Sequence, residues 1–437
     1  MRGAAVHSAR RVVVTGLGVV APLGNDLDSF WSGLLAGRSG IDQIRRFESK
    51  GFVPPYAGEV KEFQPEQYFD KRKVIKMAGR HTQLAMAAAR MSFSDARLTA
   101  EGLDAERFGI VFGTGMLRAD LADIGQMARM SRGADGRFDL RLFGAVSSSK
   151  LFPLWMLRHI PNMVSSQVAI SLNAQGPSNT ITTTCTAGAQ AIGEASRIIE
   201  RGDADVIISG GSDARVDPLS LVRLRKLGLL AICQRDPQEV SRPFDIDSSG
   251  MVCAEGAAAL VLEELEHARA RGARIYAEVV GYGTATDAYD LVYPHPEGRG
   301  LQLAINRALT DAHLSPEAVG YINAHGASIP RYDLAEARAL KTAFGKHAMR
   351  LAASSIKSMI GHAQAASGAI EAVACVKTLE TGMAPPTINL RRMAPGCDLD
   401  WVPNSARQLA VEVAMSINFG FGGYNTALIF KRWSGGV

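Results

Sequence analysis

The chain has 437 residues, enough to bury a large core and to divide into two domains or two halves. A charged fraction of 21% is ordinary for a globular protein, and the net charge of +5 is too mild to indicate nucleic-acid binding, although it suits an acidic partner. The five scattered cysteines argue against a disulfide framework or a zinc site and favour a reducing, cytoplasmic compartment. No apolar run is long enough to span a membrane.

The N-terminal segment predicts a buried strand followed by a helix. Residues 12–15 form a β-branched run that should end in a glycine turn. A signal peptide beginning at Arg10 and Arg11 is the competing interpretation, and it is disfavoured because two glycines and a threonine interrupt the apolar run. A helix over 27–35 should follow, capped by Asp26.

The rest of the first half alternates helices and strands. The basic run from residue 69 should enter a long helix that ends at residue 90, and 109–115 read as a strand with a glycine-rich exit. Residues 131–150 are polar and glycine-bearing, which predicts a loop or insertion. Helical periodicity covers 163–172, and 217–240 read as irregular.

Cys185 lies in the most informative stretch of the chain. Residues 181–184 predict a strand, 186–200 a helix, and 205–209 a second strand that ends in two glycines. Cys185 should therefore sit on a tight strand-to-helix turn, where the positive end of the helix favours thiolate over thiol. The small residues after it should leave room for a substrate. A buried structural cysteine fits the local pattern equally well.

Further candidate residues lie in the second half of the chain. They are His325, Lys357, His362, Glu371 and Phe421. Each has an ordinary structural interpretation, such as a buried histidine, a surface lysine or a core phenylalanine. Like Cys185, however, the two histidines follow a strand or open a helix beside glycine, where functional residues gather in α/β folds.

A weak internal repeat suggests a duplication. Glycine followed by a closing strand occurs from Gly256 and again from Gly422. Two copies of one α/β unit, split near residue 265, would explain this. The expected division is a half over 1–265 that carries Cys185 and a half over 266–437 that carries the other candidate residues.

The motifs together resemble a β-ketoacyl synthase of the β-ketoacyl-acyl-carrier-protein synthase II type, nearly from end to end. V-V-V-T-G-L-G-V-V-A-P-L-G-N resembles the first strand of that family, and T-T-T-C-T-A-G resembles its nucleophile turn. N-A-H-G, K-S-M-I-G-H and G-F-G-G-Y-N resemble its other three active-site segments. The resemblance implies an α/β, thiolase-like fold of two pseudo-duplicated α/β/α/β/α halves.

The resemblance also implies a mechanism. Cys185 would accept an acyl chain from a thioester, and the backbone N–H groups of Cys185 and Phe421 would hold the oxyanion. Malonyl thioester would then lose carbon dioxide, and His325 and His362 would donate hydrogen bonds to the enolate. Attack on the acyl-cysteine would lengthen a fatty acid or polyketide chain by two carbons. No metal or other cofactor is implied, because the substrates ride on the phosphopantetheine of an acyl carrier protein.

Two further positions match supporting residues of the family. Lys357 and Glu371 would order the site, and a lysine near His362 discourages protonation of that histidine. In the family, Phe421 would also gate entry to the acyl site. Thiolases carry a second catalytic cysteine in the final glycine loop, and the loop over 420–425 has none, which favours decarboxylative condensation.

The sequence departs from the family near the expected substrate. Ala327 and Ile329 replace two threonines that usually hydrogen-bond the pantetheine arm, a loss of about 1–3 kcal/mol in carrier binding if nothing compensates. Tyr424 also replaces a threonine. These changes indicate a specialised, secondary-metabolism synthase rather than the housekeeping enzyme. The expected substrate-binding residues are Met116, Leu224, Ala327, Ile329, Gly422 and Tyr424.

Two kinds of partner follow from the resemblance. An acidic acyl carrier protein should dock on basic residues, although a solvated face is an equally good interpretation of them. These are Lys71, Arg72, Lys73, Lys76, Arg225 and Lys226. A homodimer is expected, with residues 205–209 at the subunit contact, and a heterodimer with another ketosynthase-like chain is possible.

Two alternative functions stay open. A non-catalytic, chain-length-factor-like partner subunit usually lacks the nucleophile, and Cys185 is present. A cysteine hydrolase or acyltransferase that uses His325 as its base would leave Lys357 and the second histidine without a role.

Overall fold

In the computed structural model, which describes residues 10–51, 54–116 and 121–435, ten strands form one sheet. The order across the sheet is β10-β9-β13-β14-β8-β1-β7-β6-β4-β5. The strands from the first half of the chain are β1 (Val12–Val20), β4 (Phe108–Thr114), β5 (Ser178–Ile181), β6 (Val206–Ala214) and β7 (Glu255–Glu264). Those from the second half are β8 (Ala277–Thr286), β9 (Tyr321–Asn323), β10 (Ala352–Ser354), β13 (Val413–Gly420) and β14 (Tyr424–Arg432).

The two halves of the sheet are built in the same way. In the first, β4 runs parallel to β5 and β6, while β6–β7 and β7–β1 are antiparallel. In the second, β9 runs parallel to β10 and β13, while β13–β14 and β14–β8 are antiparallel. Three residue pairs between β1 and β8 join the halves. This correspondence supports the division at residue 265, which stays a prediction.

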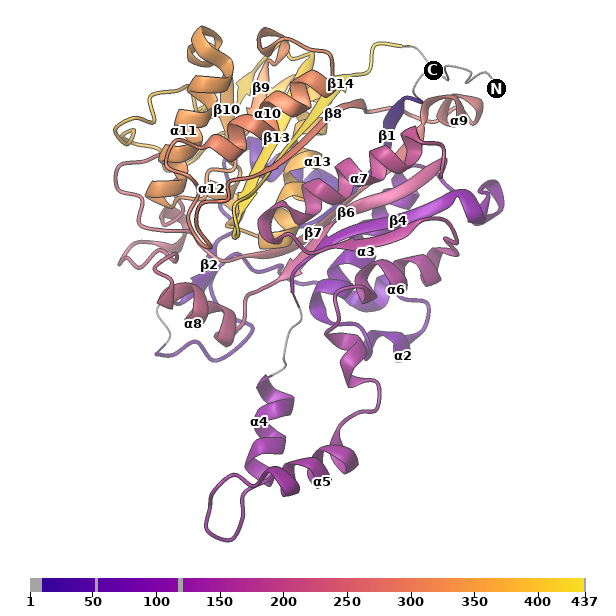
Figure 1. Ribbon diagram of the computed structural model, residues 1–437, viewed down its shortest axis with the longest axis vertical. Coiled ribbons are helices and arrows are strands. Elements are labelled where there is room, and N and C mark those ends of the chain that lie inside the picture. Colours follow the sequence, from indigo (N-terminus) through magenta and orange to yellow (C-terminus); the bar gives the residue numbers. More distant parts are fainter. Residues whose placement is uncertain (1–9, 52–53, 117–120, 436–437) are drawn as a thin grey trace.

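The two halves of the sheet form separate layers, and helices lie outside and between them. This gives five layers, α/β/α/β/α, as Figure 1 shows. On the outer face of the first half lie α3 (Arg80–Asp95) and α6 (Met163–Leu172). On the outer face of the second half lies α10 (Arg299–Asp311), with α11 (Pro330–Phe344) packed against it. Between the halves lie α7 (Ala187–Glu200) and α13 (Ser367–Thr381), each in contact with strands of both. The five layers are therefore shared by the two halves rather than repeated in each.

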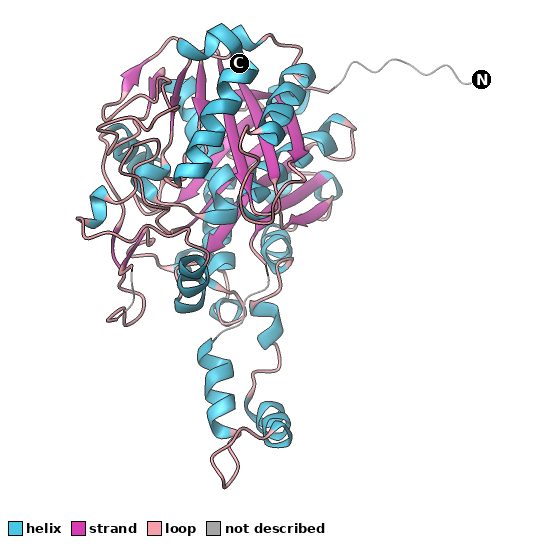
Figure 2. Cartoon of the chain, turned by 60° about the vertical axis from the view of Figure 1, so that its left-hand side comes forward, coloured by secondary structure: helices cyan, strands magenta, loops and turns pink. Residues whose placement is uncertain are grey.

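The remaining elements lie around this body. Two short hairpins pair β2 (Asp42–Gln43) with β3 (Tyr56–Ala57) and β11 (Met383–Ala384) with β12 (Arg407–Gln408). The smaller helices are α1 (Leu27–Leu35), α2 (Arg72–Ile75), α8 (Pro218–Lys226), α9 (Leu265–Ala270) and α12 (Lys357–Ile360). A projecting pair, α4 (Leu121–Met130) and α5 (Leu140–Lys150), extends away from the body (Figures 1 and 2). None of the described helices combines the length and apolarity needed to cross a membrane.

Several predicted elements are confirmed, and glycines account for two that are wrong. The helix of 27–35 with its Asp26 cap and the helix of 163–172 are as predicted. The first strand, however, does not end in a glycine turn: β1 continues through Gly16 and Gly18, where a Cβ would lie 2.2 and 2.1 Å from carbonyl oxygens of α3. These glycines let the strand approach a helix. Likewise β6 runs on through Gly210.

Three other predictions are wrong for reasons of local chemistry. The stretch over 131–150, predicted to be a loop or insertion, is not a plain loop because it contains α5, whose first N–H groups bond the Asp139 carboxylate. The irregular stretch over 217–240 contains α8, which Asp217 caps before Pro218. The predicted long helix after residue 69 is broken: α2 ends at Ile75, and α3 begins only at Arg80.

The predicted subunit contact at 205–209 is also wrong. Residues 206–209 of that stretch begin β6, which is fully buried and paired on both sides, with β7 and β4. A strand inside the sheet has no free edge to offer another chain. The edge strand on the first-half side of the sheet is β5, which ends at Ile181, shortly before Cys185.

Candidate active site

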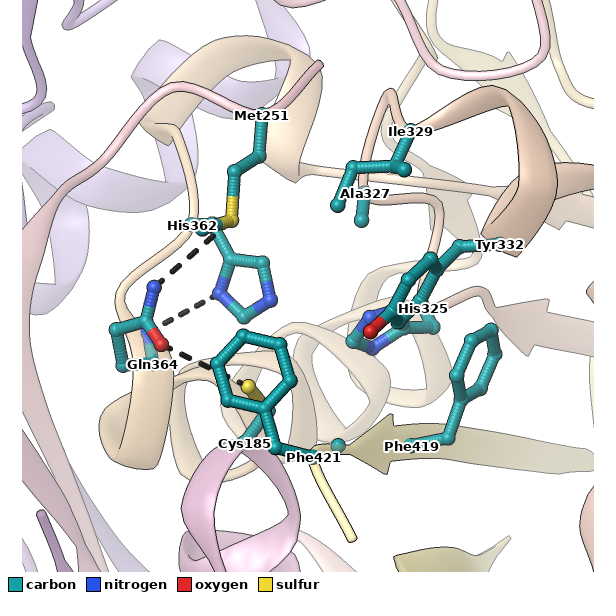
Figure 3. Close-up of a pocket in the computed structure, with 11 residues that line it drawn as sticks. Cys185, Met251, His325, Ala327, Ile329, Tyr332, His362, Gln364, Phe419 and Phe421 are labelled. Carbon is teal, nitrogen blue, oxygen red and sulfur yellow. Dashed lines mark hydrogen bonds between the residues drawn. The ribbon is translucent and has the colours of Figure 1, made fainter. Parts of the chain in front are cut away.

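The predicted catalytic residues converge at the carboxyl ends of the parallel strands. Cys185 follows β5, His325 follows β9, His362 follows β10 and Phe421 follows β13. They line one pocket, drawn in Figure 3. Its lining residues are Cys185, Met251, His325, Ala327, Ile329, Tyr332, His362, Gln364, Phe419, Gly420 and Phe421.

The turn that carries Cys185 is strained and tightly enclosed. Thr184 has a φ of +57°, which is rare for a β-branched side chain, and a single 3₁₀ turn over Thr184–Thr186 then enters α7. The strand β5 ends at Ile181, three residues earlier than predicted. A Cβ at Gly420 would lie 2.4 Å from Thr184 Oγ1 and 3.0 Å from the Cys185 nitrogen. Only glycine therefore lets the turn that carries Phe421 approach the Cys185 backbone.

The small residues after Cys185 do not leave room for a substrate, contrary to the prediction. They let α7 cross α13 and its preceding turn at close range. A Cβ at Gly188 would lie 2.9 Å from the Ala365 carbonyl oxygen, and one at Gly368 would lie 2.7 Å from the Ala189 nitrogen. Such separations are below normal contact, so the crossing requires glycine on both sides.

Cys185 is a thiol in this environment, so the predicted thiolate is wrong. Its side chain is only 4% exposed, and burial raises the pKa of the thiol to about 12. The Lys357 ammonium opposes this shift in pKa, whereas the nearby carboxyl groups of Asp213 and Glu371 add to it. The sulfur donates to Oε1 of Gln364 at 3.8 Å. Its proton must therefore move to a base when the sulfur attacks.

The two histidines are neutral at neutral pH. Their rings lie 5.3 Å apart, centroid to centroid, at an interplanar angle of 76°. Burial, followed by the charge of Lys357, lowers the pKa of both imidazoles well below the usual range. This agrees with the predicted effect of the lysine. Neutral imidazoles can donate one N–H each and accept at the other nitrogen.

The proton of His362 is placed by the main chain. Its Nδ1 accepts the backbone N–H of Gln364 at 3.1 Å, and Ser367 Oγ lies 3.2 Å from the same nitrogen. Because a backbone N–H can only donate, Nδ1 is the acceptor and the proton sits on Nε2. His362 thus presents a donor to the pocket.

His325 is held through its backbone rather than its ring. Its N–H donates to Glu336 Oε1 at 2.6 Å, and the N–H of Gly326 donates to Glu336 Oε2 at 2.8 Å. The ring packs on Phe419, with the centroids 4.2 Å apart. Both ring nitrogens are buried and have no hydrogen-bond partner among the described residues. A buried polar group of this kind indicates a ligand site.

Lys357 and Glu371 form a buried ion pair behind the histidines. The ammonium bonds the Glu371 carboxylate and donates to the carbonyl oxygen of His325 at 2.7 Å. Asn418 donates to the other oxygen of Glu371. The pair therefore ties the loop of His325 to α13 and β13, as the predicted ordering role requires.

The pocket is nearly closed. Its volume of about 10 Å³ has room for about one water molecule. Phe421 lines the pocket and is half-buried, so it lies between the pocket and solvent. Gly422 and Gly423 follow it with φ values of +80° and +75°. A substrate can reach Cys185 only if a lining side chain moves, and Phe421 is next to the most permissive backbone.

The predicted substrate-binding residues divide into two groups. Ala327 and Ile329 line the pocket. Met116, Leu224, Gly422 and Tyr424 are not among its lining residues. Met116 is instead 52% exposed, with its carbonyl oxygen accepting from Arg215 at 2.9 Å. The predicted docking residues, on and beside α2 and at the end of α8, are all exposed, and Figure 1 shows both helices at the lower end of the body.

Sequence reasoning missed several residues of the site. Met251, Tyr332, Gln364 and Phe419 also line the pocket. Glu336 was missed too, although a carboxylate on the first helix after the N-A-H-G segment was a usable signal. Gln364 could have been noticed because it lies two residues beyond His362. Nothing near Met251 in the sequence marks it.

The chain is similar to known proteins along most of its length. Residues 9–268 match the family "Beta-ketoacyl synthase, N-terminal domain", and residues 276–391 match "Beta-ketoacyl synthase, C-terminal domain". The chain belongs to the β-ketoacyl synthase family. It is 44% identical, over 97% of its length and 98% of the relative, to 3-oxoacyl-[acyl-carrier-protein] synthase 2 of Synechocystis sp..

Solved ketosynthases have the same fold, which confirms the predicted thiolase-like architecture. The ishigamide ketosynthase/chain length factor has a TM-score of 0.87 and 34% identity, covering 98% of this chain and 100% of that one. A ketosynthase solved with its type II PKS acyl-carrier protein and bound to the hexaketide has a TM-score of 0.83 and 34% identity, with the same coverage.

Proposed function

We propose that this β-ketoacyl synthase catalyses decarboxylative Claisen condensation of an acyl thioester with malonyl-acyl carrier protein. One observation carries the proposal: a buried cysteine shares a pocket with two neutral imidazoles, one of which has its proton fixed on the pocket side. Acyl transfer, decarboxylation and carbon–carbon bond formation can all take place at that pocket. The product is a fatty acyl or polyketide chain two carbons longer.

The first step loads the nucleophile. The sulfur of Cys185 attacks the thioester carbonyl, and the carrier thiol leaves. His362 cannot take the thiol proton because its Nε2 is already protonated and its Nδ1 is engaged. His325 has a free ring nitrogen, so it takes the proton and returns it to the departing thiol.

The second step makes the carbon nucleophile. The bond between the malonyl carboxylate and its methylene carbon breaks, and carbon dioxide leaves with the resulting enolate still attached to the carrier. His362 Nε2–H and a ring N–H of His325 donate to the enolate oxygen. Donation needs neutral imidazoles, and the lowered pKa of both rings supplies them.

The third step forms the new bond. The enolate carbon attacks the acyl carbon on Cys185, and the sulfur leaves as a thiolate when the carbonyl reforms. The thiolate then takes up one proton from solvent, which regenerates the thiol. The backbone N–H groups of Cys185 and Phe421 hold the oxyanion, a role worth roughly 3–4 kcal/mol per donor in other enzymes. The close approach at Gly420 supports this pairing. Lys357 and Glu371 act as positioning residues.

An acyl carrier protein is the proposed partner in each step. A ketosynthase of the same fold has been solved with its type II PKS acyl-carrier protein. The exposed basic residues of α2 and α8 offer a surface of the right charge. We expect catalysis without a metal or other cofactor, and a cytoplasmic location.

A homodimer is proposed as well. Between residues 121 and 158, a region called the arm below, large apolar side chains are exposed that a monomer would leave in water. They are Met130, Phe138, Leu140, Leu142, Phe152, Leu154 and Met156. The edge strand β5 offers a second surface for a copy of the chain. Alternatively, a chain-length factor, which is named together with one solved ketosynthase, covers these apolar side chains.

The deciding experiment follows acyl transfer and decarboxylation separately. Wild-type protein should acquire an acyl adduct on Cys185 by intact mass spectrometry and release carbon dioxide from malonyl-acyl carrier protein. Cys185→Gln should lose the adduct and keep decarboxylation, because the histidines do that work. The absence of an adduct on the wild-type protein refutes the proposal.

The same experiment tests the alternatives. A non-catalytic partner subunit would acquire no adduct. A hydrolase or simple acyltransferase would acquire one but release no carbon dioxide. Neither is favoured, since Cys185 faces two histidines and a buried lysine stands behind them.

A further inference from the structure

The side chain of Gln364 places an amide beside the nucleophile, in a pocket lined otherwise by histidines, apolar groups and the Tyr332 ring. Gln364 has a φ of +51°, a conformation that favours glycine. A non-glycine residue in such a conformation is a reason to ask what its side chain does. Figure 3 shows the amide on the same side of the pocket as His362 and Met251.

The two ends of the amide are unequally satisfied. Oε1 accepts from the Cys185 thiol at 3.8 Å, whereas Nε2 meets the thioether sulfur of Met251 at 3.9 Å. A thioether is a weak acceptor, and Gln364 is only 9% exposed. The amide N–H group therefore lacks a strong acceptor among the described residues.

Acylation of Cys185 changes the surroundings of this amide. The thiol proton is lost, so Oε1 loses its donor, and the acyl chain replaces it beside the sulfur. Carbon 1 of the chain is bonded to the sulfur, and the backbone N–H groups take up its oxygen. Carbon 3, two bonds farther on, is the next carbon that carries oxygen in a polyketide-type intermediate, and it lies within reach of an amide 3.8 Å from the sulfur.

We propose that Gln364 is a specificity-determining residue that recognises, by hydrogen bonding, an oxygen on carbon 3 of the acyl group. The inference rests on the proposed function, since it requires an acyl-Cys185. Nε2–H donates to a 3-keto or 3-hydroxy oxygen, and Oε1 can accept from a 3-hydroxyl. A saturated chain leaves Oε1 unpaired and Nε2 with only the weak thioether acceptor, which disfavours it. The substrate class is therefore 3-oxygenated acyl thioesters.

A matched pair of small substrates tests the inference. Hexanoyl and 3-hydroxyhexanoyl thioesters of N-acetylcysteamine differ only at carbon 3, and neither needs a carrier protein. The rate of Cys185 acylation is followed by intact mass spectrometry. For the wild-type protein, we expect the 3-hydroxy substrate to react roughly tenfold faster, the effect of one satisfied buried hydrogen bond.

Two variants assign the preference to the amide. Gln364→Met keeps the length of the side chain and removes both polar ends, so the rate ratio should fall to about one. Gln364→Leu serves the same purpose if the methionine variant does not fold. Gln234→Met makes the same change at an exposed glutamine outside the pocket and is the matched control, which should keep the wild-type ratio.

Each outcome has a definite meaning. Equal rates for the wild-type protein overturn this inference while leaving the proposed function intact. A ratio that survives in Gln364→Met assigns the preference to another residue and also overturns it. No adduct from either thioester or from acyl-carrier substrates contradicts the proposed function itself.

Discussion

The catalytic centre and the arm handle polarity in opposite ways. In the centre, Lys357 and Glu371 are 1% exposed and bonded to each other. In the arm, apolar side chains such as Phe138 and Leu140 are 55% and 73% exposed. Buried charges and exposed apolar surface are both costly for a protein in water.

The two regions differ in how the free-energy cost of buried charge or of exposed apolar surface is compensated. The charges of the centre are compensated within the chain, by an ion pair, an asparagine and a backbone carbonyl. The arm has no comparable cover from the rest of the described chain. The centre is therefore a property of one folded chain, whereas the apolar side chains of the arm would be covered only in the proposed assembly. The following predictions test that contrast.

Breaking the ion pair should have the largest effect. Lys357→Met leaves Glu371 buried without its counter-charge, which should cost about 3–5 kcal/mol of unfolding free energy. Decarboxylation should fall at least about 100-fold because the His325 loop loses its anchor. Urea denaturation and carbon dioxide release measure the two effects. The control, Lys357→Met with Glu371→Leu, should recover most of the stability and little activity; a single variant as stable as wild type contradicts the account.

The sealed interior should also determine the pH dependence. Because the pKa of the Cys185 thiol is about 12, its alkylation by iodoacetamide should rise about tenfold per pH unit from 7 to 9 without a plateau. Decarboxylation by Cys185→Gln should stay constant from pH 8 down to 6, since both imidazoles have lowered pKa values and remain neutral. A loss of decarboxylation near pH 6.5 would show that a histidine with an ordinary pKa is involved.

Polar substitutions in the arm should weaken assembly. Phe138→Ser with Leu140→Ser removes apolar surface that a second copy would cover, so dimer dissociation should become roughly 10–100-fold easier. Light scattering across a dilution series measures this. Leu291→Ser is the control, because Leu291 is 83% exposed outside the arm. A dimer unaffected by the arm variant would mean that another surface holds it.

Charge reversal on α2 should have the smallest effect. Lys73→Glu should slow acylation from an acyl carrier protein about fivefold at low salt, and the difference should shrink at high salt. N-acetylcysteamine thioesters should react as with wild type. Lys346→Glu, another exposed lysine, is the control. Equal losses in the two variants would indicate a general charge effect rather than docking.

The features that were predicted correctly are those that depend on neighbouring residues in the sequence. Cys185, His325 and His362 were found because each lies in a short motif at a strand end, and the helix of 163–172 was found from its period. The strand through Gly16 was cut short because its continuation depends on α3, a contact that the sequence does not display. The thiol state of Cys185 was missed for the same reason: burial by distant segments outweighs the nearby helix end.

Gln364 shows the same limit within a recognised motif. Its position next to His362 was visible, but its contact with a sulfur 179 residues away was not. The reverse holds for the arm, where a glycine-bearing, polar composition concealed α5 because the helix depends on its Asp139 cap and not on a buried face.

The crossing of α7 and α13 has a mechanical consequence. The sulfur belongs to one half of the molecule and both imidazoles to the other, and the sheet joins these halves through only three residue pairs. The spacing of the reacting atoms therefore depends on contacts outside the sheet, among them those of Gly188 and Gly368 and the backbone hydrogen bonds of His362 to Val252 and Ala254. A single methyl group added at either glycine would push the packed helices apart. This would shift the sulfur relative to the imidazoles, although the methyl group itself would not enter the pocket.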